Sequence, residues 1–197
     1  CLSDIYLESI VKNSDWLSGS QNLKYNTDYK HTGEISTDQL KSLGVEYSII
    51  GHYERVRDFN ENAVIINNKL IAALDANIFP ILCFGENIDD DYHEAIPKIL
   101  DKYLKDVENI EFIIFAYEPI FAIGTGALPS KKRIEEVISF VNEYLEDKYK
   151  KKPNLLYGGS VDSSNINDII NIEGINGVLV GDISSNIKEV ERIIQSV

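Results

Sequence analysis

The sequence predicts an α/β fold built around a parallel β-sheet, because short apolar runs alternate with helical patterns along the whole chain. The apolar runs are continuous rather than alternating, as is typical of strands covered on both faces. They lie at residues 47–50, 79–84, 112–117, 155–157 and 178–180, with a weaker run at 16–21. Repeated strand–helix alternation indicates right-handed βαβ units. No low-complexity linker or break in composition divides the chain, so we expect one domain over residues 1–197.

The helices between the strands are indicated by apolar residues that recur at intervals of three and four. The longest such patterns lie at residues 61–76, 130–149 and 186–194, and shorter ones at 4–11, 36–43, 92–104 and 164–170. Six strands, each followed by a helix, could form an open doubly wound sheet. An eight-stranded barrel would need two more strands.

Composition excludes several classes of function. The chain has 197 residues with 19 Lys and Arg against 32 Asp and Glu, a net charge of −13. This acidic balance argues against non-specific binding of nucleic acid, which needs clustered basic residues. No apolar run approaches the roughly 18 residues of a membrane span, and no signal-peptide pattern is present. The two cysteines form no CxxC pair, so we expect a cytoplasmic protein in which Cys83 packs in the core.

The ends of the predicted strands carry the residues that could perform chemistry. Enzymes of the α/β class place their active sites at the carboxyl ends of parallel strands. Four such ends are rich in glycine and polar residues: GHYER at 51–55, YEPIFAIGTG at 117–126, YGGS at 157–160 and GD at 181–182.

Together with HTGEIS at 31–36 and LCFGE at 82–86, these runs resemble the triosephosphate isomerase family, in order and at similar spacing over nearly the entire chain. The resemblance implies a (β/α)8 TIM barrel, of which about six βα units and the second helix lie in this chain. The chain contains no Met and begins at Cys1. We therefore expect an N-terminally incomplete barrel, since a barrel of this kind runs to about 250 residues.

The resemblance also implies an activity, the interconversion of dihydroxyacetone phosphate and glyceraldehyde 3-phosphate in glycolysis and gluconeogenesis, with no metal and no organic cofactor. Glu118 matches the base that moves a proton between adjacent carbons, and His52 matches the neutral imidazole that polarises the carbonyl. The residues agree with these roles. The reaction needs a carboxylate base removed from water and a hydrogen-bond donor at the substrate oxygens. His52 is predicted at a helix N-terminus, where the neutral imidazole is favoured.

Other positions match the family less directly. Glu54 either lies beside the reacting centre, which we favour, or anchors an ion pair. Phosphate recognition is expected from backbone N–H groups, because glycine lets the chain approach an anion closely. The matching residues are Gly124, Ser160, Gly181 and Asp182. Taken alone, the Gly158-Gly159 pair could equally end a strand without binding phosphate.

A polar loop at residues 25–36 is longer than usual between a strand and a helix. In the family the corresponding loop inserts into a second subunit, so the resemblance implies a homodimer in which Thr32 reaches the neighbouring site. The alternative is a merely exposed loop.

Two residues depart from the family pattern near the predicted site: Tyr53 replaces a usual serine and Asp182 replaces a glycine. They motivate an alternative substrate, a related ketose phosphate such as a four-carbon one. The Asn-x-Lys strand that opens the family's barrel is absent from this chain. Its absence motivates a second alternative, a non-catalytic barrel paralogue.

Overall fold

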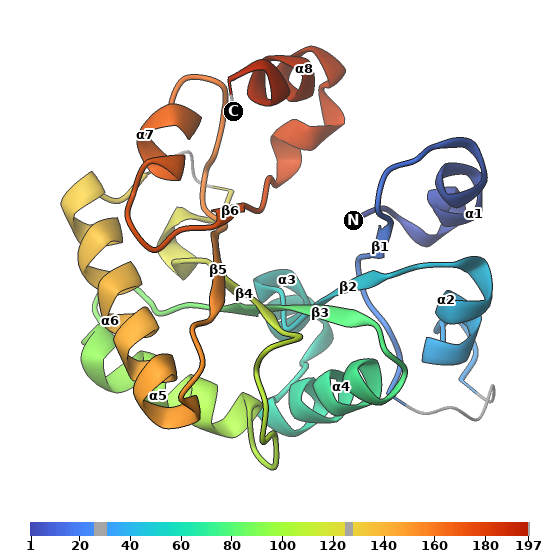
Figure 1. The fold of residues 1–197 in the computed structure, drawn as a ribbon, viewed down its shortest axis with the longest axis horizontal. Helices are drawn as coiled ribbons and strands as arrows, with labels where there is room; N and C mark the ends of the chain where they lie inside the picture. Colours follow the sequence, from blue (N-terminus) through green and yellow to red (C-terminus); the bar gives the residue numbers. More distant parts are fainter. Residues whose placement is uncertain (26–30, 125–127, 197) are drawn as a thin grey trace. The chain divides into compact units, whose positions relative to one another are not determined.

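The computed structural model describes residues 1–25, 31–124 and 128–196, and it confirms the α/β class (Figure 1). Within these residues six strands form one sheet, in which their spatial order follows the chain. The pairs β1–β2, β2–β3 and β5–β6 are parallel. Sequential order with parallel pairing is what consecutive βα units of a (β/α)8 barrel produce. The strands are β1 (Gly19–Ser20), β2 (Tyr47–Ile50), β3 (Phe79–Phe84), β4 (Ile114–Tyr117), β5 (Asn154–Tyr157) and β6 (Gly177–Val178).

The predicted helices are confirmed to within two residues at each end. The long helices bury the apolar residues that predicted them, as α6 does along one face. Ser130 caps the first turn of α6 by accepting the N–H of Arg133. The helices are α1 (Asp4–Asn13), α2 (Thr37–Leu43), α3 (Tyr53–Phe59), α4 (Ala63–Asp75), α5 (Tyr92–Tyr103), α6 (Lys131–Tyr149), α7 (Ile166–Ile170) and α8 (Ile187–Gln195), with 3-10 turns η1 (Ile120–Ala122) and η2 (Asp182–Ser185).

Three strand predictions need correction. Strand β4 begins at Ile114 rather than 112, because the N–H of Ile113 donates to the carbonyl of Ile110 in a turn. Strand β6 ends at Val178 rather than 180, since only the N–H of Leu179 still reaches β5 beyond it. Strand β1 is confined to two residues of the weak run at 16–21, whose first two residues are exposed.

Helix α3 has an extent that apolar periodicity could not predict, because none of its residues is buried. Its two ends define it instead. The His52 side chain accepts the N–H of Glu54 at the N-terminus, and Asn60 closes the C-terminus in the left-handed conformation, with φ of 54°. The helix N-terminus expected at His52 is therefore confirmed.

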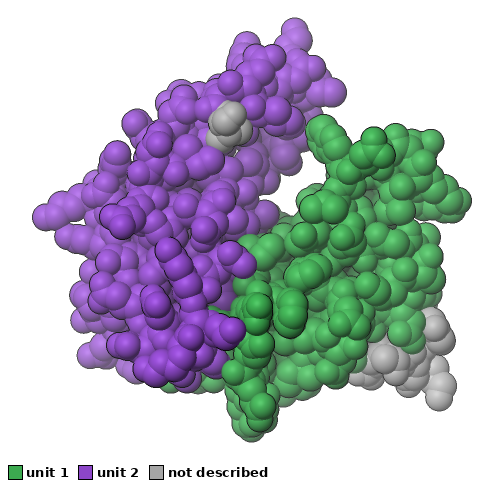
Figure 2. All heavy atoms as spheres, in the orientation of Figure 1, with its two compact units in different colours: residues 1–83, 99–114 green, residues 84–98, 115–197 purple. Residues whose placement is uncertain are grey.

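The chain divides into two compact units (Figure 2). Each unit has buried apolar residues of its own. Unit 1 comprises residues 1–83 and 99–114, and its core includes Leu23, Leu40 and Leu70. Unit 2 comprises residues 84–98 and 115–197, and its core includes the fully buried Phe115, Tyr117 and Tyr157. The single domain stays a prediction. Among the described residues, no helix combines the length and the apolar character that crossing a membrane requires.

Candidate active site

Glu118 directly follows the last residue of β4, in unit 2, and is only 5% exposed. Its backbone N–H donates to the carbonyl of Phe84 at 2.7 Å, which fixes it beside the end of β3. The chain passes very close on both sides. A Cβ on Gly85 would lie 1.8 Å from the carbonyl oxygen of Glu118, and a Cβ on Gly158 would lie 2.8 Å from its Cγ. The carboxylate predicted to act as base is thus largely removed from water and held between two glycines.

A second carboxylate, Glu86, is fully buried in unit 2 next to the chain that carries Glu118. Its Oε1 accepts the phenol of Tyr117 at 3.0 Å and Nη2 of Arg133 at 2.8 Å, and its carbonyl accepts the N–H of Ile120 at 3.0 Å. Burial, followed by the charge of Glu86, raises the pKa of the Tyr117 phenol, so this phenol stays protonated and donates. Glu86 therefore anchors the chain immediately before and after Glu118-Pro119.

Glu86 belongs to the LCFGE run at 82–86, but the sequence alone predicts no role for it. The available signal is its position, because Glu86 is a charged residue only two positions beyond the end of the buried strand β3. Its partner Arg133 lies 47 positions away on α6 and stacks over the ring of Tyr92 at 4.1 Å. No motif or spacing in the sequence indicates that Glu86, Arg133 and Tyr92 lie together.

The residues predicted to bind phosphate lie in unit 2. Gly124 follows η1 with φ of 65°, a conformation that favours glycine. The Ser160 hydroxyl donates to the carbonyl of Ala122 at 2.7 Å, which joins the YGGS run to η1. Gly181 and Asp182 are exposed at the start of η2. In the described part of the chain, the backbone N–H groups of Ser160 and Gly181 donate no hydrogen bond.

His52 and Glu54 lie in unit 1, where β2 leads into α3. Nδ1 of His52 lies 3.4 Å from the backbone N of Glu54 and 3.9 Å from its Oε2. The first contact requires that Nδ1 carries no proton, whereas the second is longer than a hydrogen bond and would be an ion pair only if the ring were protonated. We favour the neutral ring, since the helix N-terminus disfavours a positive charge and the Glu54 side chain is 57% exposed. The remaining proton then lies on Nε2, which can donate.

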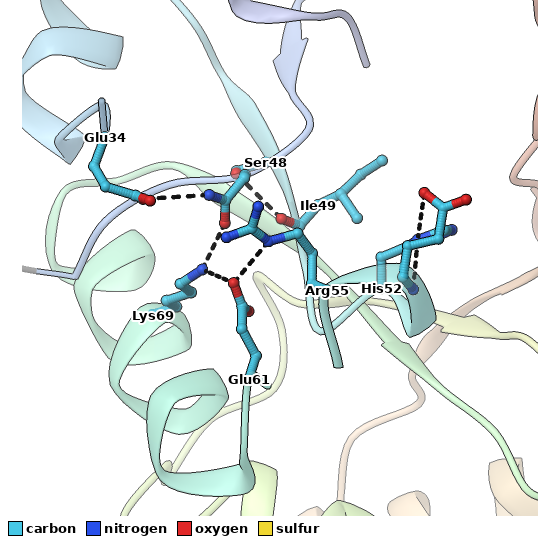
Figure 3. Close-up of polar contacts among 9 residues, drawn as sticks. Glu34, Ser48, Ile49, His52, Arg55, Glu61 and Lys69 are labelled. Carbon is cyan, nitrogen blue, oxygen red and sulfur yellow. Dashed lines mark hydrogen bonds and ion pairs between the residues drawn. The ribbon is translucent and has the colours of Figure 1, made fainter. Parts of the chain in front are cut away.

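A buried ion cluster in unit 1 fixes α3 to its neighbours (Figure 3). Oε1 of Glu61 accepts Nε of Arg55 at 2.7 Å and Nζ of Lys69 at 2.6 Å, and Lys69 also donates to Asn22 at 2.6 Å. Burial lowers the pKa of Lys69, against the opposing effect of Glu61. The ion-pair anchor of α3 is therefore Glu61, which sequence reasoning missed. The available signal was Lys69 itself, a lysine on the buried stripe of α4.

Thr32 is exposed in the described part of the polar loop; residues 26–30 of that loop lie outside the described residues. Described residues on either side of it form hydrogen bonds. The N–H of Glu34 donates to the carbonyl of His31, that of Lys24 donates to Ile35, and Ser36 with Gln39 forms a capping box that begins α2.

Within residues 1–25, 31–124 and 128–196, no three carboxylate, imidazole or thiol side chains gather where they could hold a metal ion.

Comparison with known proteins assigns the family. A model of the family described as "Triosephosphate isomerase" matches residues 1–197. The chain belongs to the triosephosphate isomerase family. A protein named triosephosphate isomerase from Alkaliphilus oremlandii (strain OhILAs) is 37% identical over 186 residues, which cover 89% of this chain and 75% of that protein.

Two further relatives bear the same name. The one from Wolbachia sp. subsp. Brugia malayi (strain TRS) is 37% identical over 191 residues, 96% of this chain and 78% of the relative. The one from Ehrlichia chaffeensis (strain Arkansas) is 39% identical over 178 residues, which cover 89% of this chain and 72% of the relative. The fold is accordingly that of a partial (β/α)8 barrel, and the chain is an aldose–ketose isomerase by family.

Proposed function

We propose that this protein interconverts dihydroxyacetone phosphate and glyceraldehyde 3-phosphate through an enediolate, with Glu118 as the base. The observation that carries the proposal is the burial of the Glu118 carboxylate at the end of β4, in a chain of the triosephosphate isomerase family. A carboxylate kept from water is a stronger base than a solvated one, because desolvation disfavours its charged form. It removes a proton from C1 of the ketose and returns it to C2.

His52 is proposed to stabilise the charge that develops on the substrate oxygen. As the C–H electrons move into the new double bond, the carbonyl oxygen becomes an enolate oxygen. The contact of Nδ1 with the N–H of Glu54 supports a proton on Nε2, and a neutral donor there can bond to that oxygen. Glu54 lies next to this group and is proposed to act beside the reacting centre.

The phosphate is proposed to bind to backbone N–H groups of Gly124, Ser160, Gly181 and Asp182. The unused N–H groups of Ser160 and Gly181 in the described chain support this, because an anion would satisfy them. Local attraction is needed, since a net charge of −13 repels a dianion at long range.

A lid over the intermediate is proposed for residues 119–126, of which Thr125 and Gly126 lie outside the described residues. Excluding water strengthens the electrostatic interactions in the site and prevents loss of phosphate from the enediolate. The hydrogen bond from the Ser160 hydroxyl to the carbonyl of Ala122 joins the proposed phosphate-binding run to the described part of this segment.

The test of the proposal is isomerase turnover in Glu118→Asp. The shorter side chain withdraws the carboxylate by about 1 Å, so we expect kcat to fall by about 100-fold or more while the fold is retained. Glu146→Asp, an exposed position on α6, serves as the matched control and leaves kcat unchanged. Wild-type turnover in Glu118→Asp would refute the assignment of the base.

A four-carbon ketose phosphate is the second candidate substrate. Tyr53 and Asp182 motivate it, because both depart from the family pattern at the predicted site, and Tyr53 begins α3 directly after His52. Turnover of the full-length protein on both substrates decides between them.

A further inference from the structure

Side chains of unit 2 leave no room for a Cβ at either of the two glycines that follow β5. A Cβ on Gly159 would lie 2.2 Å from Oη of Tyr157. A Cβ on Gly158 would lie 2.8 Å from Cγ, 3.1 Å from Oε1 and 3.4 Å from Cδ of Glu118. The side chain of Glu118 therefore occupies the space that any side chain at position 158 would need.

Gly158 is also poorly suited to binding an anion. Its backbone N–H already donates to the carbonyl of Tyr117 at 2.8 Å, so this group is committed to the end of β4. Phosphate binding consequently explains neither its missing side chain nor its N–H group.

Gly85, on the other side of Glu118, differs in the atoms that a Cβ would meet. There the obstruction is the backbone, with the carbonyl carbon of Glu118 at 2.6 Å, and backbone cannot yield without moving β4. At Gly158 the obstructing atoms belong to a side chain that can rotate about its own bonds. Alanine at position 158 would displace the carboxylate, whereas alanine at position 85 would displace the chain.

We propose that Gly158 is a positioning residue for Glu118: the absence of a side chain at 158 determines where the base carboxylate lies. This inference rests on the proposed function, in which Glu118 is the base. It assigns the first glycine of the YGGS run to the proton-transfer end of the substrate rather than to its phosphate.

The kinetic test is Gly158→Ala. A carboxylate displaced by about 1 Å lowers kcat by about 100-fold. The inhibition constant of inorganic phosphate stays within about twofold, because the phosphate-binding N–H groups are untouched. The control is Gly177→Ala in β6, where a Cβ would meet only Cδ2 of Leu156, at 3.2 Å, and kcat is unchanged. Unchanged kcat in Gly158→Ala, or a phosphate constant that rises in proportion to the loss of kcat, would overturn the proposal.

A melting-temperature cycle tests the contact without relying on activity. Gly158→Ala is expected to lower the melting temperature by about 3 °C in the wild-type background and by less than about 1 °C in a Glu118→Ala background, where the obstructing atoms are gone. Equal lowering in both backgrounds would overturn the contact. If the wild type lacks isomerase activity while the cycle behaves as expected, the contact stands and the role of Glu118 as base is refuted.

Discussion

At the scale of single residues, the molecule stabilises its buried charges by pairing them. Glu61 and Glu86 are 5% and 0% exposed, and each accepts from an arginine and from a second donor, Lys69 or Tyr117. A buried carboxylate without such partners would cost several kcal/mol. The first cluster holds α3, which begins directly after His52, and the second holds the residues that flank Glu118. Both therefore support the predicted catalytic groups indirectly.

The ion cluster in unit 1 yields a stability prediction. Lys69→Met leaves Glu61 with Arg55 as its remaining cation, and we expect the free energy of unfolding to fall by about 3 kcal/mol in urea denaturation. Lys132→Met is the control, because Lys132 is 84% exposed and its surface pair with Glu136 contributes less than about 1 kcal/mol. Equal effects of the two substitutions on the free energy of unfolding would show that the buried Lys69 stabilises the fold no more than an exposed lysine does.

Motif and chemistry together predict Glu118 and His52 from the sequence, because each lies just beyond the end of a continuous apolar strand. The same reasoning could not find Glu61, Lys69 or Arg133. Their partners come from other elements, and pairing across elements leaves no periodic pattern along the chain. Only the unusual position of Lys69 on a buried helical stripe gave a hint.

At the scale of elements, apolar periodicity predicted the helices that bury a stripe, such as α4 and α6, and failed for α3, which buries none. Strand ends were less predictable than strand existence. Apolar residues also lie outside the strands, so an apolar run does not mark where a strand begins or ends. Val180 lies beyond the end of β6, and the exposed Phe112 lies before the start of β4.

The loop that contains Thr32 gives a prediction for assembly. Thr32 is exposed, and the capping box at Ser36 begins helix α2 four residues further along, so the described side of the loop leaves Thr32 open to a second subunit. We expect the protein to sediment as a homodimer at micromolar concentration. Thr32→Arg is expected to shift it toward monomer, because an unpaired charge is costly to bury. Ser42→Arg, at an exposed position on α2, is the control. A monomeric wild type would contradict the homodimer.

At the scale of the whole molecule, family membership and a sheet of sequentially ordered strands agree on a partial (β/α)8 barrel, and the proposed chemistry is placed at a few strand ends. The buried glutamate that follows β4 is proposed to carry a proton between two carbons of a phosphorylated sugar.

The most direct test of that claim is isomerisation of dihydroxyacetone phosphate by the full-length protein in D2O, followed by NMR. The wild type is expected to form glyceraldehyde 3-phosphate with solvent deuterium at C2 in part of the product, because the proton exchanges while Glu118 carries it. Glu118→Gln keeps the shape of the side chain but cannot accept a proton, and we expect its rate to fall by about 100-fold or more. Product formed by Glu118→Gln at the wild-type rate would contradict the account.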